Sequence, residues 1–184
     1  MAIIFNSGAM RSDSVFSMNR SVYYVDAQNN GVACPNGAFL TITGIKQFDT
    51  YGAAKNALSN DIVKAPAAVT DSVVVADLCM VSSGTIAGEV YRLGEKQYDL
   101  AMPAGEPVRV RELELGDRFW LGDGNFEGTP EEGKYAVLTA GKVTLTPADN
   151  NDAEGFTVQI IRIDSLTTGQ RANGSKILCE VIAL

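Results

Sequence analysis

The feature that most constrains this chain is a series of short apolar runs, many of alternating polarity, separated by glycine-containing turns. The runs at residues 21–27 and 38–45 flank turn sequences at Asn29-Asn30-Gly31 and Asn36-Gly37. Asn-Gly pairs favour tight hairpin turns because both residues tolerate a positive φ angle. Further runs lie at residues 72–81, 84–93, 108–115, 118–122, 135–139, 143–146, 156–163 and 176–184. About ten short strands at this spacing predict a mainly β fold of sandwich or barrel type.

One run changes the face on which its apolar residues lie. Val108 and Val110 occupy even positions, whereas Leu113 and Leu115 occupy odd positions. Successive side chains of a strand point to opposite faces, so one regular strand cannot bury both pairs. We therefore predict a bulge, or a crossing from one sheet to another, near residues 111–112.

A second run repeats this change. Phe156, Val158 and Ile160 share one parity, and Ile161 and Ile163 take the other. The pattern again predicts a bulge or a crossing between sheets. Strands that leave one sheet for another are typical of small barrels and sandwiches.

Two connections can also be predicted. Gly141 and Lys142 are expected to form the turn of a hairpin that joins residues 135–139 to residues 143–146. Residues 49–61 are the one plausible helix, because Thr50 can cap a segment rich in alanine. At two to three turns it would be a short connector helix.

The first twenty residues differ from the rest. They are polar and carry isolated large apolar side chains without helical or strand periodicity. We interpret residues 1–20 either as a frayed terminus or as an extended N-terminal arm that becomes ordered on a partner. In the second case the candidate interface residues are Phe5, Met10, Arg11, Val15, Phe16, Met18 and Arg20.

The remainder divides near a break in the β pattern. Residues 99–108 contain one glycine and two prolines. We therefore expect one β subdomain at residues 21–104 and a second at residues 105–184, or a single continuous domain at residues 21–184.

Composition limits the possible functions. The chain has 184 residues, no histidine and a formal net charge of −7. The lack of histidine removes Ser–His–Asp triads, Cys–His pairs and His-ligated zinc. A net anion without a basic block is a poor ligand for nucleic acid or an anionic membrane. We expect a protein that is not an enzyme, needs no cofactor, and binds neither nucleic acid nor membrane.

The three cysteines are far apart and form no C-x-x-C pair. Cys79 and Cys179 lie in apolar runs and are expected to be buried strand residues. Cys34 lies beside Pro35 and Asn36 and is expected to be an exposed turn residue. The first residues contain no basic segment followed by a sustained apolar core, so we expect no export signal.

Several candidate sites are weak. Asp149, Asn151 and Asp152 offer oxygen ligands, but an EF-hand loop starting at Asp149 has Glu154 where glycine is needed and Ile160 where glutamate is needed. We therefore expect an acidic hairpin loop there rather than a calcium site.

Other segments are equally unpromising as sites. The acidic loop at residues 122–133 lacks the context of a phosphate site. The pairs Glu112 with Glu114 and Glu131 with Glu132 suit solvated positions better than glycosidase chemistry. Trp120 is expected in the core rather than on a sugar-binding surface.

The second half of the chain resembles a known family. Residues 105–121, GEPVRVRELELGDRFWL, are followed by GKYAVLTAGKVTL, EGFTVQIIRI and a short apolar closing strand. This order resembles that of the capsid decoration proteins, also called head-stabilising or cement proteins, of tailed bacteriophages. The resemblance covers roughly residues 105–184.

The resemblance implies a non-enzymatic structural protein on the outside of a virion. It implies that the protein is made in the host cytoplasm and then binds the major capsid protein, and that it could associate with itself as a homo-oligomer. The competing interpretation is a carbohydrate- or receptor-binding β module of a head fibre or tail. That class needs exposed aromatic side chains on one face, and this chain has one tryptophan and six tyrosines.

Overall fold

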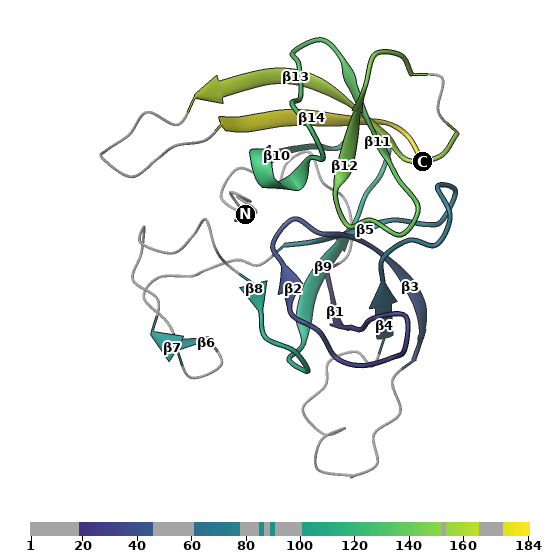
Figure 1. The fold of residues 1–184 in the computed structure, drawn as a ribbon, viewed down its shortest axis with the longest axis vertical. Helices are drawn as coiled ribbons and strands as arrows, with labels where there is room; N and C mark the ends of the chain where they lie inside the picture. Colours follow the sequence, from purple (N-terminus) through teal and green to yellow (C-terminus); the bar gives the residue numbers. More distant parts are fainter. Residues whose placement is uncertain are drawn as a thin grey trace.

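The computed structural model is mainly β, as the sequence predicts, and contains a closed barrel beside an open sheet (Figure 1). It describes residues 19–45, 61–77, 85–86, 89–90, 101–151, 154–165 and 175–184. The barrel has the strand order β1-β4-β3-β5-β9. Its strands are β1 (Asn19–Tyr24), β3 (Phe39–Ile45), β4 (Asp61–Lys64), β5 (Val74–Ala76) and β9 (Val108–Glu112).

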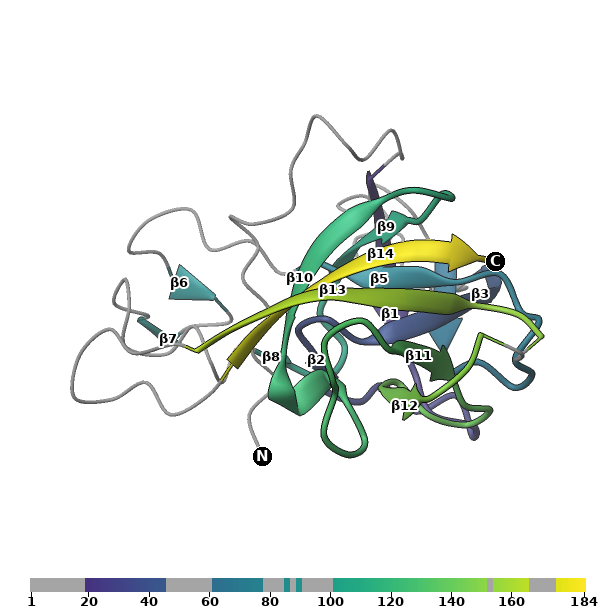
Figure 2. The same ribbon diagram turned by 90° about the horizontal axis from the view of Figure 1, so that it is seen from above.

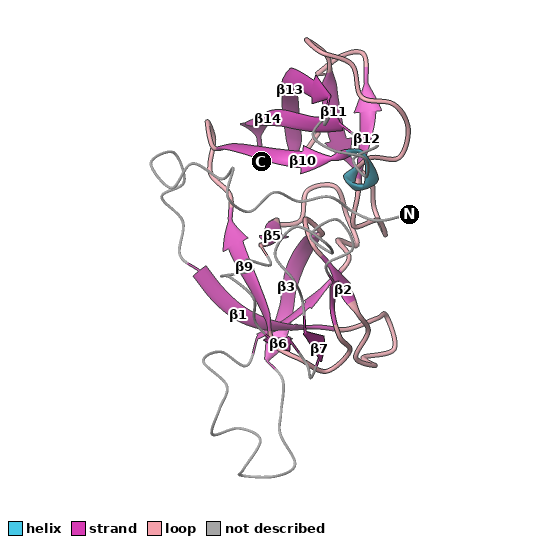
Figure 3. Cartoon of the chain, turned by 90° about the vertical axis from the view of Figure 1, so that its left-hand side faces the viewer, coloured by secondary structure: helices cyan, strands magenta, loops and turns pink. Residues whose placement is uncertain are grey.

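The open sheet has the order β10-β14-β13-β11-β12, and all its pairings are antiparallel. Its strands are β10 (Arg118–Gly122), β11 (Tyr135–Leu138), β12 (Leu145–Ala148), β13 (Thr157–Ser165) and β14 (Ser175–Ala183). Figures 1 and 3 both show this sheet beside the barrel, and Figure 2 shows how far β13 and β14 extend as a long pair. All five strands follow the barrel strands in sequence.

The remaining described elements are short. The strands β2 (Cys34–Pro35) and β8 (Ala101–Met102) pair with each other, as do β6 (Thr85–Ile86) and β7 (Glu89–Val90). A single 3₁₀ turn, η3 (Asp123–Asn125), follows β10. None of the described helices is long and apolar enough to cross a membrane. The helix predicted at residues 49–61 lies outside the described residues, apart from Asp61, which is the first residue of β4.

The barrel encloses a core of small side chains. The buried residues that pack inside it are Val22, Cys34, Ala38, Leu40, Val63, Val74, Ala76, Val108 and Val110. A five-stranded barrel is narrow, so valine and alanine fill its interior without strain.

Between the barrel and the sheet lies a second core, which we call the shared core layer. The barrel side contributes Phe39, Val73 and Val75. The rest comes from residues 113–181 and includes Phe119, Phe126, Phe156, Val158, Ile160, Ile177 and Cys179. The Phe39 ring lies 6.2 Å from that of Phe119 and 5.4 Å from that of Phe156, measured between ring centroids. Apolar burial is thus continuous from one region to the other.

Polar contacts also join the two regions. Asn125, fully buried, donates from Nδ2 to the carbonyl oxygens of Asn36 and Gly37 at 3.2 and 3.0 Å. Its Oδ1 accepts the Gly122 N–H at 3.1 Å. Gly37 has a φ angle of 74°, and a Cβ at this position would collide with the Asn125 side chain. Gly37 is therefore needed both for the turn at residues 36–37 and for the hydrogen bonds of Asn125, which we call the Asn125 bridge.

The crossing near residues 111–112 is confirmed. β9 ends at Glu112; Val108 and Val110 lie in the barrel core, whereas Leu113 lies in the shared core layer. Leu115 is 64% exposed, contrary to the prediction that it shares the buried face. The chain turns directly after Leu113, with the Asp117 N–H bonded to the Glu114 carbonyl, and Leu115 lies within this turn.

The change of sheet therefore falls after β9. We expected a boundary near residue 104, but β9 pairs with β1 and β5 of the barrel. The glycine and prolines of residues 99–108 mark a turn that precedes a barrel strand. The shared core layer draws on both regions, so the barrel and the sheet pack against each other through common buried side chains.

The second predicted irregularity is also confirmed. The register of β13 against β14 shifts between Ile160, which pairs with Cys179, and Arg162, which pairs with Leu178. Ile161 is the inserted residue, and a bulge of this kind moves the following side chains to the opposite parity. Ile163 can then pack against the shared core layer.

The hairpin around Gly141 is confirmed as well. β11 and β12 pair antiparallel, with Leu138 opposite Leu145, and Gly141 has a φ angle of 78°. Trp120, in contrast, was predicted incorrectly as a core residue. Phe119 and Leu121 point into the shared core layer, so strand alternation leaves Trp120 half-buried on the outer face, where Lys176 Nζ lies 4.2 Å from its ring centre.

Candidate functional site

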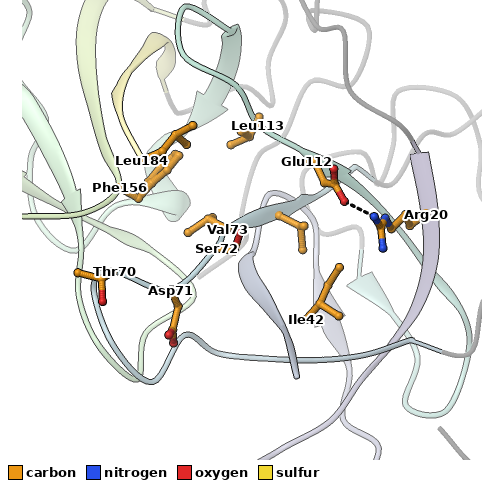
Figure 4. A pocket seen from close by; sticks show the side chains of 11 residues that line it. Arg20, Ile42, Thr70, Asp71, Ser72, Val73, Glu112, Leu113, Phe156 and Leu184 are labelled. Carbon is orange, nitrogen blue, oxygen red and sulfur yellow. Dashed lines mark ion pairs between the residues drawn. The ribbon is translucent and has the colours of Figure 1, made fainter. Parts of the chain in front are cut away.

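A groove of about 440 Å³ lies between the barrel and the sheet (Figure 4). We call it the interlayer groove. Its apolar lining is Ile42, Val73, Val74, Leu113, Phe156 and Leu184, and its polar lining is Arg20, Thr70, Asp71, Ser72 and Glu112. These residues come from β1, β3, the start of β5 and the segment before it, the end of β9, and one end of the β13–β14 pair, where Phe156 precedes β13 and Leu184 follows β14. The groove exists only because the two regions pack together.

The apolar floor of the groove is well packed. Val73, Leu113 and Phe156 are 6%, 5% and 1% exposed. Leu184, at the C-terminal end, is 57% exposed and forms part of the rim. Figure 4 shows Leu184 and Phe156 at one end of the groove and Arg20 at the other. The floor is therefore apolar but closely packed, and its aromatic ring is too deeply buried to stack on a sugar.

Charged side chains line the end of the groove at which Arg20 lies. Arg20 Nη2 lies 2.7 Å from a Glu112 carboxylate oxygen, and Nη1 lies 3.5 Å from Asp61. The side chains of Arg20 and Glu112 are each about 40% exposed, so water weakens this pairing. The pair nevertheless orients Arg20 across the mouth of the groove.

Asp71 supports the opposite wall. Its carboxylate accepts the backbone N–H groups of Ala67 and Ala68 at 2.8 and 2.9 Å. This turn sets the path of residues 65–73 against the sheet. There the Phe156 N–H bonds to the Val69 carbonyl, and a Cβ at Gly155 would collide with that same carbonyl.

A second cluster of charges lies on the outer face of the barrel. The Asp77 side chain is 1% exposed, and its Oδ2 accepts bonds from Arg109 Nη2 at 2.9 Å and Arg111 Nε at 2.6 Å. Asp77 Oδ1 and Arg109 Nε are buried without a hydrogen-bond partner. Arg109 and Arg111 alternate along β9 and so share a face. Two guanidinium groups on one carboxylate form a structural ion-pair cluster.

Of the candidate interface residues, the structure places Arg20 alone, in β1. Phe5, Met10, Arg11, Val15, Phe16 and Met18 lie outside the described residues. The interpretation of residues 1–20 as an arm applies only to residues 1–18, because Asn19 and Arg20 belong to a barrel strand.

The acidic candidates behave as surface groups. Asp149 is exposed and lies 2.9 Å from Lys134 Nζ, and hydrogen bonding to Asp149 raises the pKa of Lys134. Asp152 lies outside the described residues. Glu112 pairs with Arg20, while Glu114, Glu131 and Glu132 are exposed. Within the described ranges no three His, Cys, Asp or Glu side chains gather in a way that could hold a metal ion.

The described cysteines are packing residues. Cys179 is fully buried in β14, as predicted. Cys34 is also fully buried, which corrects our expectation of an exposed turn residue: β2 pairs with β8, and the Cys34 side chain enters the barrel core. Burial raises the pKa of Cys34 to about 12 and raises that of Cys179 as well. A nucleophilic thiol requires the opposite shift. Cys79 lies outside the described residues.

Sequence reasoning missed the interlayer groove, the Asp77 cluster and the Asn125 bridge. The alternation of Arg109 and Arg111 is a local signal for two cations on one face, but their partner Asp77 lies 32 residues before Arg109. The groove lining spans residues 20–184, and no local pattern announces such an assembly. Comparison with protein-family models, curated protein sequences and solved structures gives no match for this chain.

Proposed function

We propose that this protein is a capsid decoration protein: a non-enzymatic virion component that binds the outer surface of the major capsid protein lattice and stabilises the head. The resemblance of residues 105–184 to decoration proteins of tailed bacteriophages supports this function. So does the acidic composition, since a negative protein on the exterior does not adsorb nucleic acid.

The observation that carries the proposal is how β1 is held. β1 follows directly on residues 1–18, the candidate attachment arm, and is paired on both edges within the closed barrel. Asn19–Val22 pair with β9, and Val22–Tyr24 pair with β4. Hydrogen bonds of a ladder run across its strands, so tension along β1 loads all of these bonds together. An arm that holds a body on a capsid needs this kind of anchor.

The surface of the body supports an attachment through the arm. Among the described residues, the exposed large hydrophobic side chains are Leu115 and Leu184. Residues 1–18 supply Phe5, Met10, Val15, Phe16 and Met18, together with the cation Arg11. Burying apolar side chains is the main favourable term in most protein associations. The arm therefore offers more to a capsid subunit than the described faces of the body do.

A carbohydrate- or receptor-binding module of a head fibre or tail is the alternative. It needs an aromatic ring free to stack on a sugar. Trp120 is half-buried and has Lys176 4.2 Å from its ring centre. This partly exposed ring is the one that we test for such a role, so Trp120→Ala separates the two functions.

The test uses heads assembled from the major capsid protein of the phage that encodes the chain, without this protein. Full-length protein is expected to co-sediment with these heads and to raise their melting temperature. Deletion of residues 2–14 is expected to leave the melting curve of the free protein in place while weakening co-sedimentation at least about ten-fold. Trp120→Ala, as the matched surface change, is expected to bind heads like wild type. Absence of binding by the full-length protein, or binding that is lost with Trp120→Ala and kept by the deletion, would overturn the proposal.

A further inference from the structure

Two of the chain's asparagine–glycine pairs lie in the described residues, at Asn30-Gly31 and Asn36-Gly37. An asparagine before glycine can lose its side-chain amide without a catalyst, because glycine has no Cβ to shield its backbone nitrogen. That nitrogen bonds to the asparagine Cγ, the bond from Cγ to Nδ2 breaks, and ammonia leaves with the proton that the glycine amide gave up through water. Water then opens the cyclic imide to aspartate or isoaspartate. The two pairs place one reaction in two different surroundings.

The surroundings of Asn36-Gly37 oppose this reaction. Asn36 is 1% exposed. The peptide group that joins the two residues is bonded at both ends: the Gly37 N–H donates to the Ala76 carbonyl at 2.8 Å, and the Asn36 carbonyl accepts from Asn125 Nδ2 at 3.2 Å. To attack, the Gly37 nitrogen must lose its proton to water, and a buried, hydrogen-bonded N–H does so only when the structure opens locally. The fold therefore protects Asn36.

The surroundings of Asn30-Gly31 are open. Both residues are exposed, in the turn that follows β1. Val25 faces Gly31 in an antiparallel bridge. The hydrogen bonds on either side run from the N–H groups of Asp26 and Val32 to the carbonyls of Asn30 and Tyr24, respectively. A pair flanked in this way exchanges no bonds of its own, so the Gly31 N–H points away from Val25 and can lose its proton to water.

The contacts of the Asn30 side chain lie at the surface. Its Nδ2 donates to Asp26 Oδ2 at 3.2 Å, and its backbone N–H donates to Asp26 Oδ1 at 2.8 Å. Backbone hydrogen bonding from Asn30 holds the pKa of Asp26 below its ordinary value, so this carboxylate is charged at neutral pH. Water competes for such contacts, and surface turns open at little cost in free energy. The Asn30 amide can therefore leave Asp26 and meet the Gly31 nitrogen.

We propose that Asn30 is a site of spontaneous deamidation in the folded protein and that the fold protects Asn36. This inference goes beyond the proposed function and does not rest on it. The aspartate product replaces a donor to Asp26 with a second carboxylate, and like charges in contact repel each other. The isoaspartate product lengthens the main chain within the turn. Both products loosen the turn at residues 26–31, which holds the C-terminal end of β1.

Peptide mapping tests the inference on the full-length protein. Folded protein is incubated at mildly alkaline pH, and each asparagine before glycine is quantified separately from its fragment ions by mass spectrometry at successive times. Asn173-Gly174 is the chain's third such pair and lies outside the described residues, apart from which it is scored. Asn30 is expected to convert at least about ten-fold faster than Asn36, because reaction at Asn36 waits for local opening. Equal rates at these two positions, or faster conversion of Asn36, would overturn the proposal.

Unfolding supplies the control. In concentrated urea neither pair is folded, so Asn30 and Asn36 are expected to convert at similar rates, both faster than Asn36 does in the folded protein. A rate ratio that stays the same in urea would assign the difference to the neighbouring residues and contradict protection by the fold. Conversion of Asn30 in urea but not in the folded protein would show that the turn at residues 26–31 also protects Asn30, and the proposal would fail.

A variant that mimics one product tests the effect on the turn. Asn30→Asp is expected to raise the hydrogen-exchange rates of the Asp26 and Val32 N–H groups several-fold, since both bond across the turn. Asn151→Asp, which adds the same charge at another exposed position, should leave these rates unchanged. Unchanged exchange in Asn30→Asp would refute the loosening of the turn. Equal increases in both variants would attribute the effect to net charge and refute it as well.

Discussion

The barrel and the open sheet are built from five strands each, yet they bury different kinds of side chain. The barrel closes on itself, and its interior holds valine, alanine, one leucine and one cysteine. The sheet has two edges, β10 and β12, and buries its phenylalanines against the outside of the barrel. A narrow closed barrel has no room for aromatic rings, so the large apolar side chains gather where the two regions meet.

The difference shows that two contributions lie in different parts of the molecule. Backbone pairing closes the barrel, whereas most of the large apolar side chains are buried between the barrel and the sheet. Closure satisfies the backbone of every barrel strand on both edges, but each buried valine adds only a modest apolar area. The rings of Phe39, Phe119 and Phe156 bury more, and they belong to both regions at once. Since small closed units are marginal on their own, we expect barrel and sheet to unfold together.

Phe39 and Leu40 offer the strongest test of this expectation. They are neighbours on β3, both fully buried, and face the shared core layer and the barrel core respectively. Phe39→Ala and Leu40→Ala are each expected to lower the free energy of unfolding, by about 3–5 and about 2–5 kcal/mol. Urea unfolding followed by Trp120 fluorescence and by far-UV circular dichroism should give one coincident transition in both variants. Two separate transitions would break the coupling between the regions.

Asn125 makes the buried polar contacts between the two regions, as Phe39 makes apolar ones. Asn125→Ala removes the bonds to the Asn36 and Gly37 carbonyls and to the Gly122 N–H, all of which are buried. We expect a loss of about 2–3 kcal/mol in the free energy of unfolding, because buried backbone groups lose their partners. The exposed Asn151 is the control, and Asn151→Ala should change stability by less than about 0.5 kcal/mol. Similar losses in both variants would mean that the bridge does not join the regions.

Two turn aspartates are predicted to respond to pH with opposite signs. In the barrel, backbone hydrogen bonding from Asn30 lowers the pKa of Asp26. In the turn that leads into the sheet, burial raises the pKa of Asp117, and the Glu114 carboxylate adds to this shift. Asp26 therefore stabilises the fold above its ordinary pKa, and this contribution is lost as the pH falls below about 4. Asp117 favours the fold most when protonated, and this contribution is lost as the pH rises above about 4.

Asparagine substitutions make this difference measurable. Relative to wild type, Asp117→Asn should become more stable as the pH is raised from 3 to 7, because asparagine can still accept the Glu114 N–H without carrying charge. Asp26→Asn should become less stable over the same range. Urea unfolding at pH 3, 5 and 7 measures both trends. The same sign for both variants would contradict the assignment.

Exposed ion pairs between neighbouring strands should contribute least to the free energy of unfolding. Arg118 lies directly opposite Glu180, with Nε 2.5 Å from a carboxylate oxygen, and the Arg118 side chain is 53% exposed. Arg118→Gln is expected to cost about 0.5 kcal/mol or less, with a smaller effect at high salt. Arg20→Gln, which removes the barrel pair with Glu112, is expected to cost a similar amount, because the Arg20 and Glu112 side chains are also about 40% exposed. A larger loss at Arg20 that persists in 1 M salt would sharpen the contrast between the regions.

The parts of the fold that were predictable are those encoded by local periodicity. The parity changes near residue 111 and at Ile161 reflect which faces of two strands are buried, and each can be read from a few adjacent residues. The hairpin at Gly141 is local for the same reason. Trp120 and Cys34 were misassigned because apolar character alone does not say which face of a strand is covered, nor which short strands, such as β2 and β8, come together.

The candidate site was less predictable. Arg20 was predicted to be an interface residue because it ends a segment with isolated apolar side chains. The structure places it instead in an ion pair with Glu112 at the mouth of the interlayer groove. Its partners Asp61 and Glu112, and the Asn125 bridge to Gly37, join residues that are distant in sequence. A single sequence contains no local signal for such pairings, because they depend on which strands lie next to each other in the barrel, that is, on its strand order.

That order has a consequence for the newly made protein. β1 pairs with β4 on one edge, but its other edge gains a partner only when Val22 meets Val108, about 85 residues later, which at about 5–20 residues per second takes roughly 4–17 s of translation. Until then one edge of β1 faces solvent and nascent chains nearby, and unpaired strand edges are sites of aggregation. Synonymous codons that slow elongation across residues 25–107 should therefore reduce the soluble yield, while equally slow codons after residue 112 should not.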